Sequence, residues 1–93
     1  MDLKSLELDD FFESVLLLKN QDECYKFFED ICTIAELSAI AQRLKVAGML
    51  RDKKTVLEIS ETTGVSTATI SRVNKCLNYG TGGYNLVLDR LAK

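Results

Sequence analysis

Residues 55–77 read TVLEISETTGVSTATISRVNKCL, and this stretch decides the fold. It predicts two short helices, one from Val56 to Thr63 and one capped by Ser66 that ends near Leu77. Glycine adopts the positive φ angle that a tight turn between crossing helices needs, so Gly64 is placed at the turn. The apolar positions expected to lock the two helices together are Ile59, Val65, Ile70 and Val73. The stretch is therefore predicted to be a helix-turn-helix.

The other side chains of the second helix favour contact with DNA, because they are short or basic. Threonine and alanine methyls can meet thymine, hydroxyls can meet base donors or acceptors, and a helix N-terminus favours a phosphate. The predicted base contacts are Thr67, Ala68, Thr69 and Ser71. The predicted phosphate contacts are Ser66, Arg72, Lys75, Lys53 and Lys54. A merely solvated helix face usually carries glutamate and lysine, so the hydroxyl-rich face favours double-stranded DNA as the partner.

Charge is distributed unevenly along the chain, although the net charge is only −2. Residues 1–42 hold three basic and ten acidic residues, a net −7, whereas residues 43–93 hold nine basic and four acidic residues, a net +5. This asymmetry is typical of a basic working surface on an acidic scaffold. The acidic total also leaves open a second function, that of a dimeric helical protein-interaction module that does not read DNA.

Four further helices complete a predicted all-α fold of six helices in a single domain, residues 1–93. They are expected at about residues 6–18, after the cap at Asn20, from the cap at Thr33 to about Arg51, and at residues 84–91. Residues 1–52 are expected to dimerise, residues 55–77 to form the helix-turn-helix, and residues 84–92 the C-terminal helix.

Several function classes are disfavoured by what the chain lacks. There is no histidine, no paired-cysteine motif and no glycine-rich phosphate loop, so neither a metal site nor an enzyme is predicted. Cys24, Cys32 and Cys76 are expected to be buried free thiols. No apolar run is long enough for a membrane span and the N-terminus is acidic, so the cytoplasm is the expected location.

The segment from Gly64 to Arg72 resembles the recognition segment of the tryptophan repressor superfamily. The likeness extends back to residues 33–36 and 42–45 and covers residues 10–92 loosely. Residues 78–84 are similar to a repressor-related subfamily of Gram-positive bacteria. The resemblance implies an intertwined homodimer, a two-fold DNA site with half-sites about 34 Å apart, and repression by blocking a promoter. The residues themselves do not separate a repressor from an activator.

The resemblance also implies an effector pocket between two arginines, which correspond here to Arg43 and Arg72. Val73 stands where the family has a glycine, and Cys76 where it has a serine that receives the ligand's ammonium group. Valine adds bulk and cysteine is a poor partner for a charge. Leu57 replaces a DNA-contacting arginine of the first motif helix. No cofactor is expected, and the effector is expected to be a molecule other than tryptophan, or absent.

Overall fold

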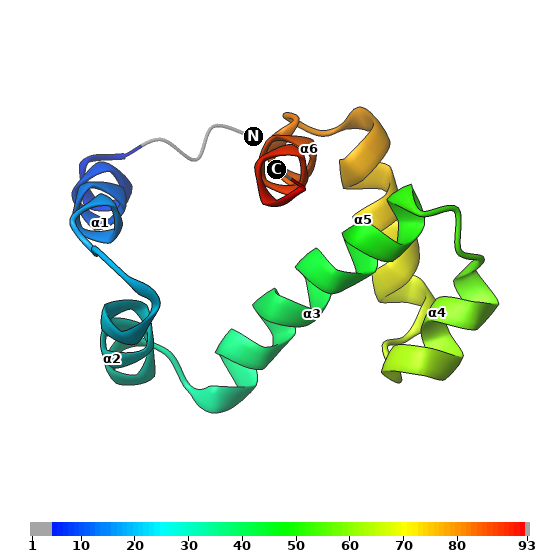
Figure 1. The fold of residues 1–93 in the computed structure, drawn as a ribbon, viewed down its shortest axis with the longest axis horizontal. Coiled ribbons are helices and arrows are strands. Elements are labelled where there is room, and N and C mark those ends of the chain that lie inside the picture. The colour runs from blue at the N-terminus through cyan, green and yellow to red at the C-terminus, as the bar shows by residue number, and fades with distance from the viewer. Residues whose placement is uncertain (1–4, 93) are drawn as a thin grey trace. The chain divides into compact units, whose positions relative to one another are not determined.

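The computed structural model describes residues 5–92, and in that range it contains six α-helices and no strand (Figure 1). The helices are α1 (Leu6–Leu16), α2 (Gln21–Ile31), α3 (Ile34–Arg51), α4 (Val56–Thr63), α5 (Thr67–Tyr79) and α6 (Gly83–Leu91). The predicted all-α class is confirmed. No helix of the described range is long and apolar enough to cross a membrane.

Side-chain caps explain where five of these helices begin. The hydroxyl of Ser5, the amide oxygen of Asn20 and the hydroxyl of Thr33 each accept the backbone N–H three residues later. Thr55 and Ser66 do the same at the starts of α4 and α5. Each such bond satisfies an amide that has no partner within its helix, and is worth about 1 kcal/mol.

Two of these caps include a glutamate whose carboxylate accepts the backbone N–H of the cap residue, as in a capping box. Thr33 donates its backbone N–H to the carboxylate of Glu36 over 2.8 Å, and Thr55 donates to Glu58 over 3.4 Å. The hydrogen bonds from the Thr33 backbone and then from its side chain lower the pKa of Glu36. At the start of α2 the carboxylate of Glu23 instead accepts the backbone N–H of Lys19, the residue before the cap.

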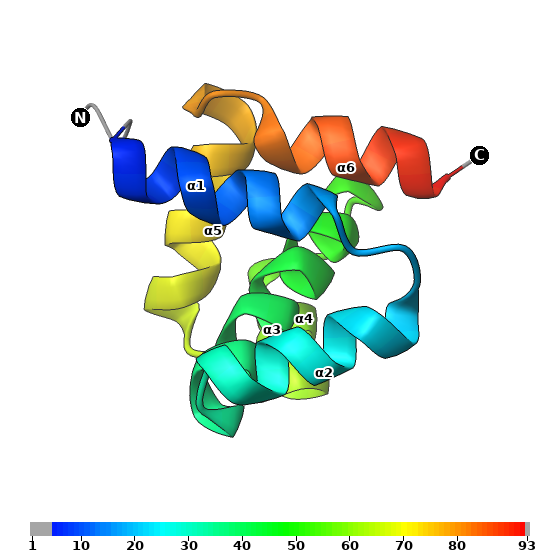
Figure 2. The ribbon, with the colours of Figure 1, turned by 90° about the vertical axis from the view of Figure 1, so that its left-hand side faces the viewer.

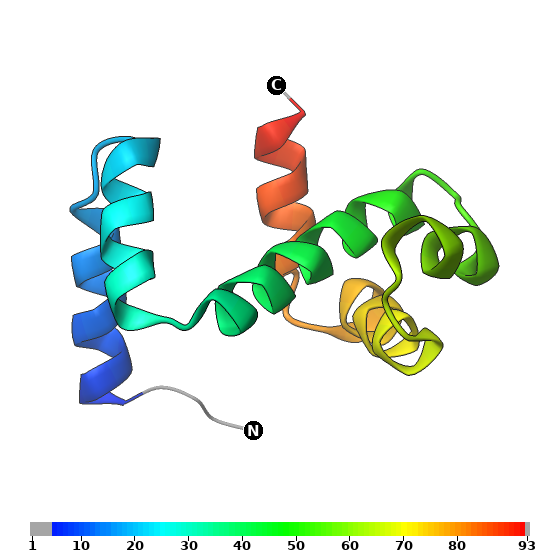
Figure 3. The same cartoon turned by 90° about the horizontal axis from the view of Figure 1, so that it is seen from below.

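The chain divides into two compact units, Met1–Leu37 and Ser38–Lys93. In the first unit, α1 and α2 lie side by side and antiparallel (Figures 2 and 3). Phe11 joins them, since its ring lies 6.1 Å from that of Phe27 and 6.3 Å from that of Phe28. Neither helix contains a fully buried residue, and Leu6, Leu16 and Leu17 are each more than 70% exposed.

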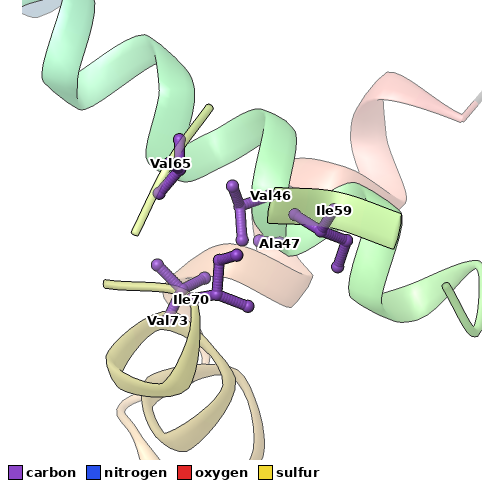
Figure 4. Close-up of a cluster of buried hydrophobic side chains, with 6 residues drawn as sticks. All are labelled: Val46, Ala47, Ile59, Val65, Ile70 and Val73. Carbon is purple, nitrogen blue, oxygen red and sulfur yellow. The ribbon is translucent and has the colours of Figure 1, made fainter. Parts of the chain in front are cut away.

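The second unit contains the buried core, which forms where α3, α4 and α5 meet (Figure 4). Its buried side chains are Val46, Ala47, Ile59, Val65, Ile70 and Val73. All four positions predicted to hold the helix-turn-helix are among them. Leu88 and Tyr84 of α6 pack against this cluster, so the closing helix belongs to the same core.

The connection from α3 to α4 is held in a fixed shape by the end of α3. The backbone N–H of Lys53 bonds to the carbonyl of Leu50, and that of Lys54 to the carbonyl of Met49, both over 3.1 Å. This is the Schellman pattern, in which the residue after the helix takes a left-handed conformation. Lys53 occupies that position with φ 66°, where glycine is the usual residue.

Three sequence predictions need correction. The first helix ends at Leu16 rather than Leu18, because the amides of Leu17 and Leu18 turn back to carbonyls three residues earlier. The fifth helix runs two residues beyond Leu77, to Tyr79. The expectation that all three cysteines are buried is wrong: Cys24 and Cys32 are half-buried, and Cys76 is exposed because it lines an open pocket beside the turn that precedes α6.

The turn at Gly64 can be tested by substitution. Gly64 has φ 75° and a Cβ added there would meet no atom within 4 Å, so Gly64→Ala introduces backbone strain without a clash. We expect the free energy of unfolding to fall by about 1–2 kcal/mol, measured by urea denaturation at fixed protein concentration. Gly83→Ala is the control, because that site is equally open but has no positive φ. An equal loss in both variants would contradict this account.

Lys53 gives a prediction of opposite sign. Lys53→Gly relieves the left-handed strain, so the free energy of unfolding should rise by about 0.5–1 kcal/mol. Lys54→Gly, one residue later and without a positive φ, should instead be neutral or destabilising. Thermal and urea denaturation of the pair measure the difference. A loss of stability in Lys53→Gly would mean that the lysine is not strained.

Candidate nucleic-acid interface

The turn between α4 and α5 is set by hydrogen bonds within the motif itself. The Thr63 hydroxyl donates to the carbonyl of Ile59 over 2.7 Å and accepts the backbone N–H of Val65 over 3.1 Å. Gly64 caps α4 in the left-handed conformation, with its N–H bonded to Ser60. The burial of Ile59 on one side and Ile70 on the other then fixes the direction in which α5 leaves the turn.

Ser66 organises the first turn of α5. Its hydroxyl accepts the backbone N–H of Thr69 and donates to the Thr69 hydroxyl over 3.0 Å. The amides of Thr67 and Ala68, at the first two positions of the helix, have no carbonyl to bond to within it. This end of α5 therefore presents backbone donors, which is the arrangement that attracts a phosphate.

The predicted base contacts do not all lie on the same side of α5. Thr67, Ala68 and Ser71 are exposed on the outer face. Thr69 is half-buried, bonded to Ser66, and faces α3 as part of the lining of a pocket. Its hydroxyl is thus engaged within the protein, whereas the other three side chains are available to a partner.

The exposed face of α5 has one further property: it contains no acidic residue. The helix holds no aspartate or glutamate along its 13 residues, in a chain with 14 acidic residues. Arg72 and Lys75 are exposed on it, and Lys53 and Lys54 are exposed before α4. The unit Ser38–Lys93 includes all nine basic residues of the positive half of the chain, with only four acidic ones.

Arg51 has a structural partner and is set apart from this basic group. Its guanidinium lies 2.8 Å from the carboxylate of Asp89 and joins the end of α3 to α6. That contact gives Arg51 a role within the fold.

The two arginines of the implied effector pocket do not line the same pocket. Arg43 lines a pocket of about 200 Å³ between α3 and the start of α5, with Ser66 and Thr69. Arg72 is not part of that lining. Cys76 lines a different pocket of about 420 Å³ beside the turn that precedes α6. Val73 is buried in the core, so it fills space between helices rather than forming a pocket wall.

Two exposed asparagines of α5 lie outside the predicted set of DNA contacts. Asn74 and Asn78 are exposed and bond to one another, and they follow Thr67 by seven and eleven positions. Residues with that spacing share one side of a helix, so the sequence did contain a signal for them.

Comparison with known proteins identifies the family. Residues 6–92 match the family of Trp repressor proteins. The chain belongs to the Trp repressor family. Trp repressor-family proteins are DNA-binding transcription regulators, so at the level of the family this chain is one as well.

Three proteins are similar to this chain along nearly its whole length. The uncharacterized protein YerC of Bacillus subtilis (strain 168) is 55% identical over 89 residues, covering 96% of this chain and 86% of YerC. A crystal structure of a TrpR-like protein from Eubacterium eligens has a TM-score of 0.93 at 53% identity, covering 97% of this chain and 93% of the other. A structure of a candidate Trp repressor from Staphylococcus aureus has a TM-score of 0.92 at 43% identity, covering 97% and 90%.

Proposed function

We propose that this chain is a dimeric, sequence-specific DNA-binding protein that represses transcription by occupying a promoter. The observation that carries the proposal is the exposed outer face of α5, which carries the hydroxyls of Thr67 and Ser71 and the basic Arg72 and Lys75, and no acidic side chain. Membership of the Trp repressor family supports it. Repression rather than activation rests on that membership alone.

Each element of the motif has a role in this proposal. Thr67, Ala68 and Ser71 read base edges in the major groove, where methyl and hydroxyl groups distinguish base pairs. Thr69 holds the first turn against α3 and positions the reading face. The phosphate contacts are Ser66, Arg72, Lys75, Lys53 and Lys54.

A second copy of the chain is proposed as the partner of α1, α2 and the start of α3. These helices expose large apolar side chains that a lone chain leaves in water: Ile34 is 88% exposed, Leu16 82% and Tyr25 57%. An unburied apolar surface of this kind marks an interaction site. Two copies also place two reading helices on a two-fold DNA site.

Protein without an intact reading face should lose its affinity for DNA. Thr67→Asp with Ser71→Asp adds two negative charges to exposed positions of α5, so the fold should persist. Retention of a random-sequence duplex at low salt should fall about tenfold or more, because the charges repel phosphates. The charge-matched control is Lys19→Gln with Lys26→Gln, which lowers the net charge equally at exposed sites in the first unit.

The control pair should keep most of the affinity. Equal losses in the two variants would mean that only net charge matters and would contradict the assignment of α5. For the unmodified chain, the affinity for DNA should fall steeply as the salt concentration rises. The slope of log affinity against log salt concentration is set by the number of phosphates contacted. A protein-interaction module would show no such binding at any salt concentration.

Dimerisation is tested by a substitution that should be harmless in a monomer. Ile34 is almost fully exposed in the single chain, so Ile34→Asp should change the stability of a monomer by no more than about 0.5 kcal/mol. In the proposed dimer the same change buries a charge, and sedimentation should show a monomer at concentrations where the unmodified chain is dimeric. Leu57→Asp, on α4, is the control and should leave the dimer intact. A monomeric unmodified chain would overturn the proposal.

A further inference from the structure

Asn74 and Asn78 form a hydrogen-bonded pair on the exposed side of α5. The side-chain nitrogen of Asn78, Nδ2, lies 2.9 Å from the backbone carbonyl oxygen of Asn74 and 3.0 Å from the Asn74 side-chain oxygen, Oδ1. Both residues are exposed, so neither is needed to fill the core. An exposed pair that restrains its own side chains costs conformational entropy, which a contact with a partner would offset.

The pair fixes which end of the Asn74 carboxamide faces outward. A backbone carbonyl can only accept, so the Asn78 group beside it must be the NH2. The same NH2 then donates to the Asn74 side chain, which must present its oxygen. The Asn74 NH2, with its two N–H donors, is therefore directed away from Asn78. Asn74 presents donors to whatever approaches this face of the helix.

The position of Asn74 along α5 indicates what those donors would meet. Asn74 follows Thr67 by seven residues, which is about 10 Å along the helix axis at 1.5 Å per residue. The major groove is about 12 Å wide, so a helix whose N-terminal turn contacts base edges reaches the groove wall at about this distance. The wall consists of phosphates, which accept hydrogen bonds and carry no donor.

We propose that Asn74 is a DNA-contacting residue whose amide N–H groups donate to a backbone phosphate, and that Asn78 is the positioning residue that aims them. The proposal rests on the proposed function, because it requires α5 to enter the major groove. It adds a neutral contact to the basic ones, and the two kinds differ in their response to salt. A lysine that binds a phosphate releases a counterion, whereas an amide does not.

The experiment measures the affinity of the full chain for a duplex at several salt concentrations. Asn74→Ala should weaken binding of the dimer about tenfold or more, as expected when each protomer loses one hydrogen bond to a charged group. The loss should be uniform across sequences, and the salt slope should stay unchanged. Lys75→Gln is the matched comparison one residue later, and should reduce the slope by about one for each protomer. Alanine favours helix more than asparagine does, so the fold should be no less stable.

A double-variant cycle tests the role of Asn78. Asn78→Ala should weaken binding less than Asn74→Ala, because the Asn74 donors remain but are no longer aimed. Combining the two changes should give the affinity of Asn74→Ala alone, since Asn78 acts only through Asn74. Further loss in the double variant would overturn the positioning role.

The outcomes separate this inference from the proposed function. Unchanged affinity of Asn74→Ala, while the unmodified chain binds duplex DNA, would overturn the assignment of Asn74 alone. A loss confined to certain base pairs would overturn the phosphate contact in favour of a base contact. Failure of the unmodified chain to bind any duplex would overturn the proposed function itself.

Discussion

The burial of Ile59 and Ile70 on either side of the left-handed turn at Gly64 is the constraint on which the rest of the structure depends. Both side chains are fully buried against Val46 and Ala47 of α3, so α4 and α5 share one small core with the long helix. The part of the chain that the structure describes has a core of only six buried residues. Each contact in this core therefore supplies a large share of the stability of the fold. A change in the turn would redirect every side chain of α5 at once.

The same constraint separates the two faces of α5. Ile70 and Val73 face the core, whereas the exposed positions of α5 carry small side chains and basic groups: Thr67, Ala68, Ser71, Arg72 and Lys75. The buried side of α5 determines how the helix is oriented, and its exposed side is available for contacts with a partner. The left-handed lysine at position 53 fits this division, because a glycine would suit the backbone better but would carry no charge.

The first unit has no fully buried residue in its two helices, and its exposed apolar side chains are the reason for proposing a dimer. Helices α1 and α2 hold together through the three phenylalanines Phe11, Phe27 and Phe28, yet bury no residue fully. Their acidity contrasts with the basic second unit, which carries the proposed DNA contacts. A dimer would bury the exposed leucines and leave the acidic groups in water.

Periodicity and capping residues made most of the fold predictable. Four helix starts were predictable because the caps Asn20, Thr33, Thr55 and Ser66 have a local partner three positions on. The core of the motif was predictable because its four apolar positions obey helical spacing. Side-chain direction was less predictable. Thr69 faces α3, and Arg72 is absent from the lining of the pocket that holds Arg43 and Thr69. Both outcomes depend on the tertiary placement of the helices, which spacing alone does not encode. The exposure of Cys76 has the same cause.

The central claim is that α5 reads DNA as one of a symmetric pair, and selection of bound duplexes from a random-sequence pool tests it most directly. The account predicts enrichment of a two-fold symmetric site whose half-site centres lie about 34 Å apart, one helical turn. Recovery of a pool without any enriched sequence, or of a single asymmetric site, would contradict it.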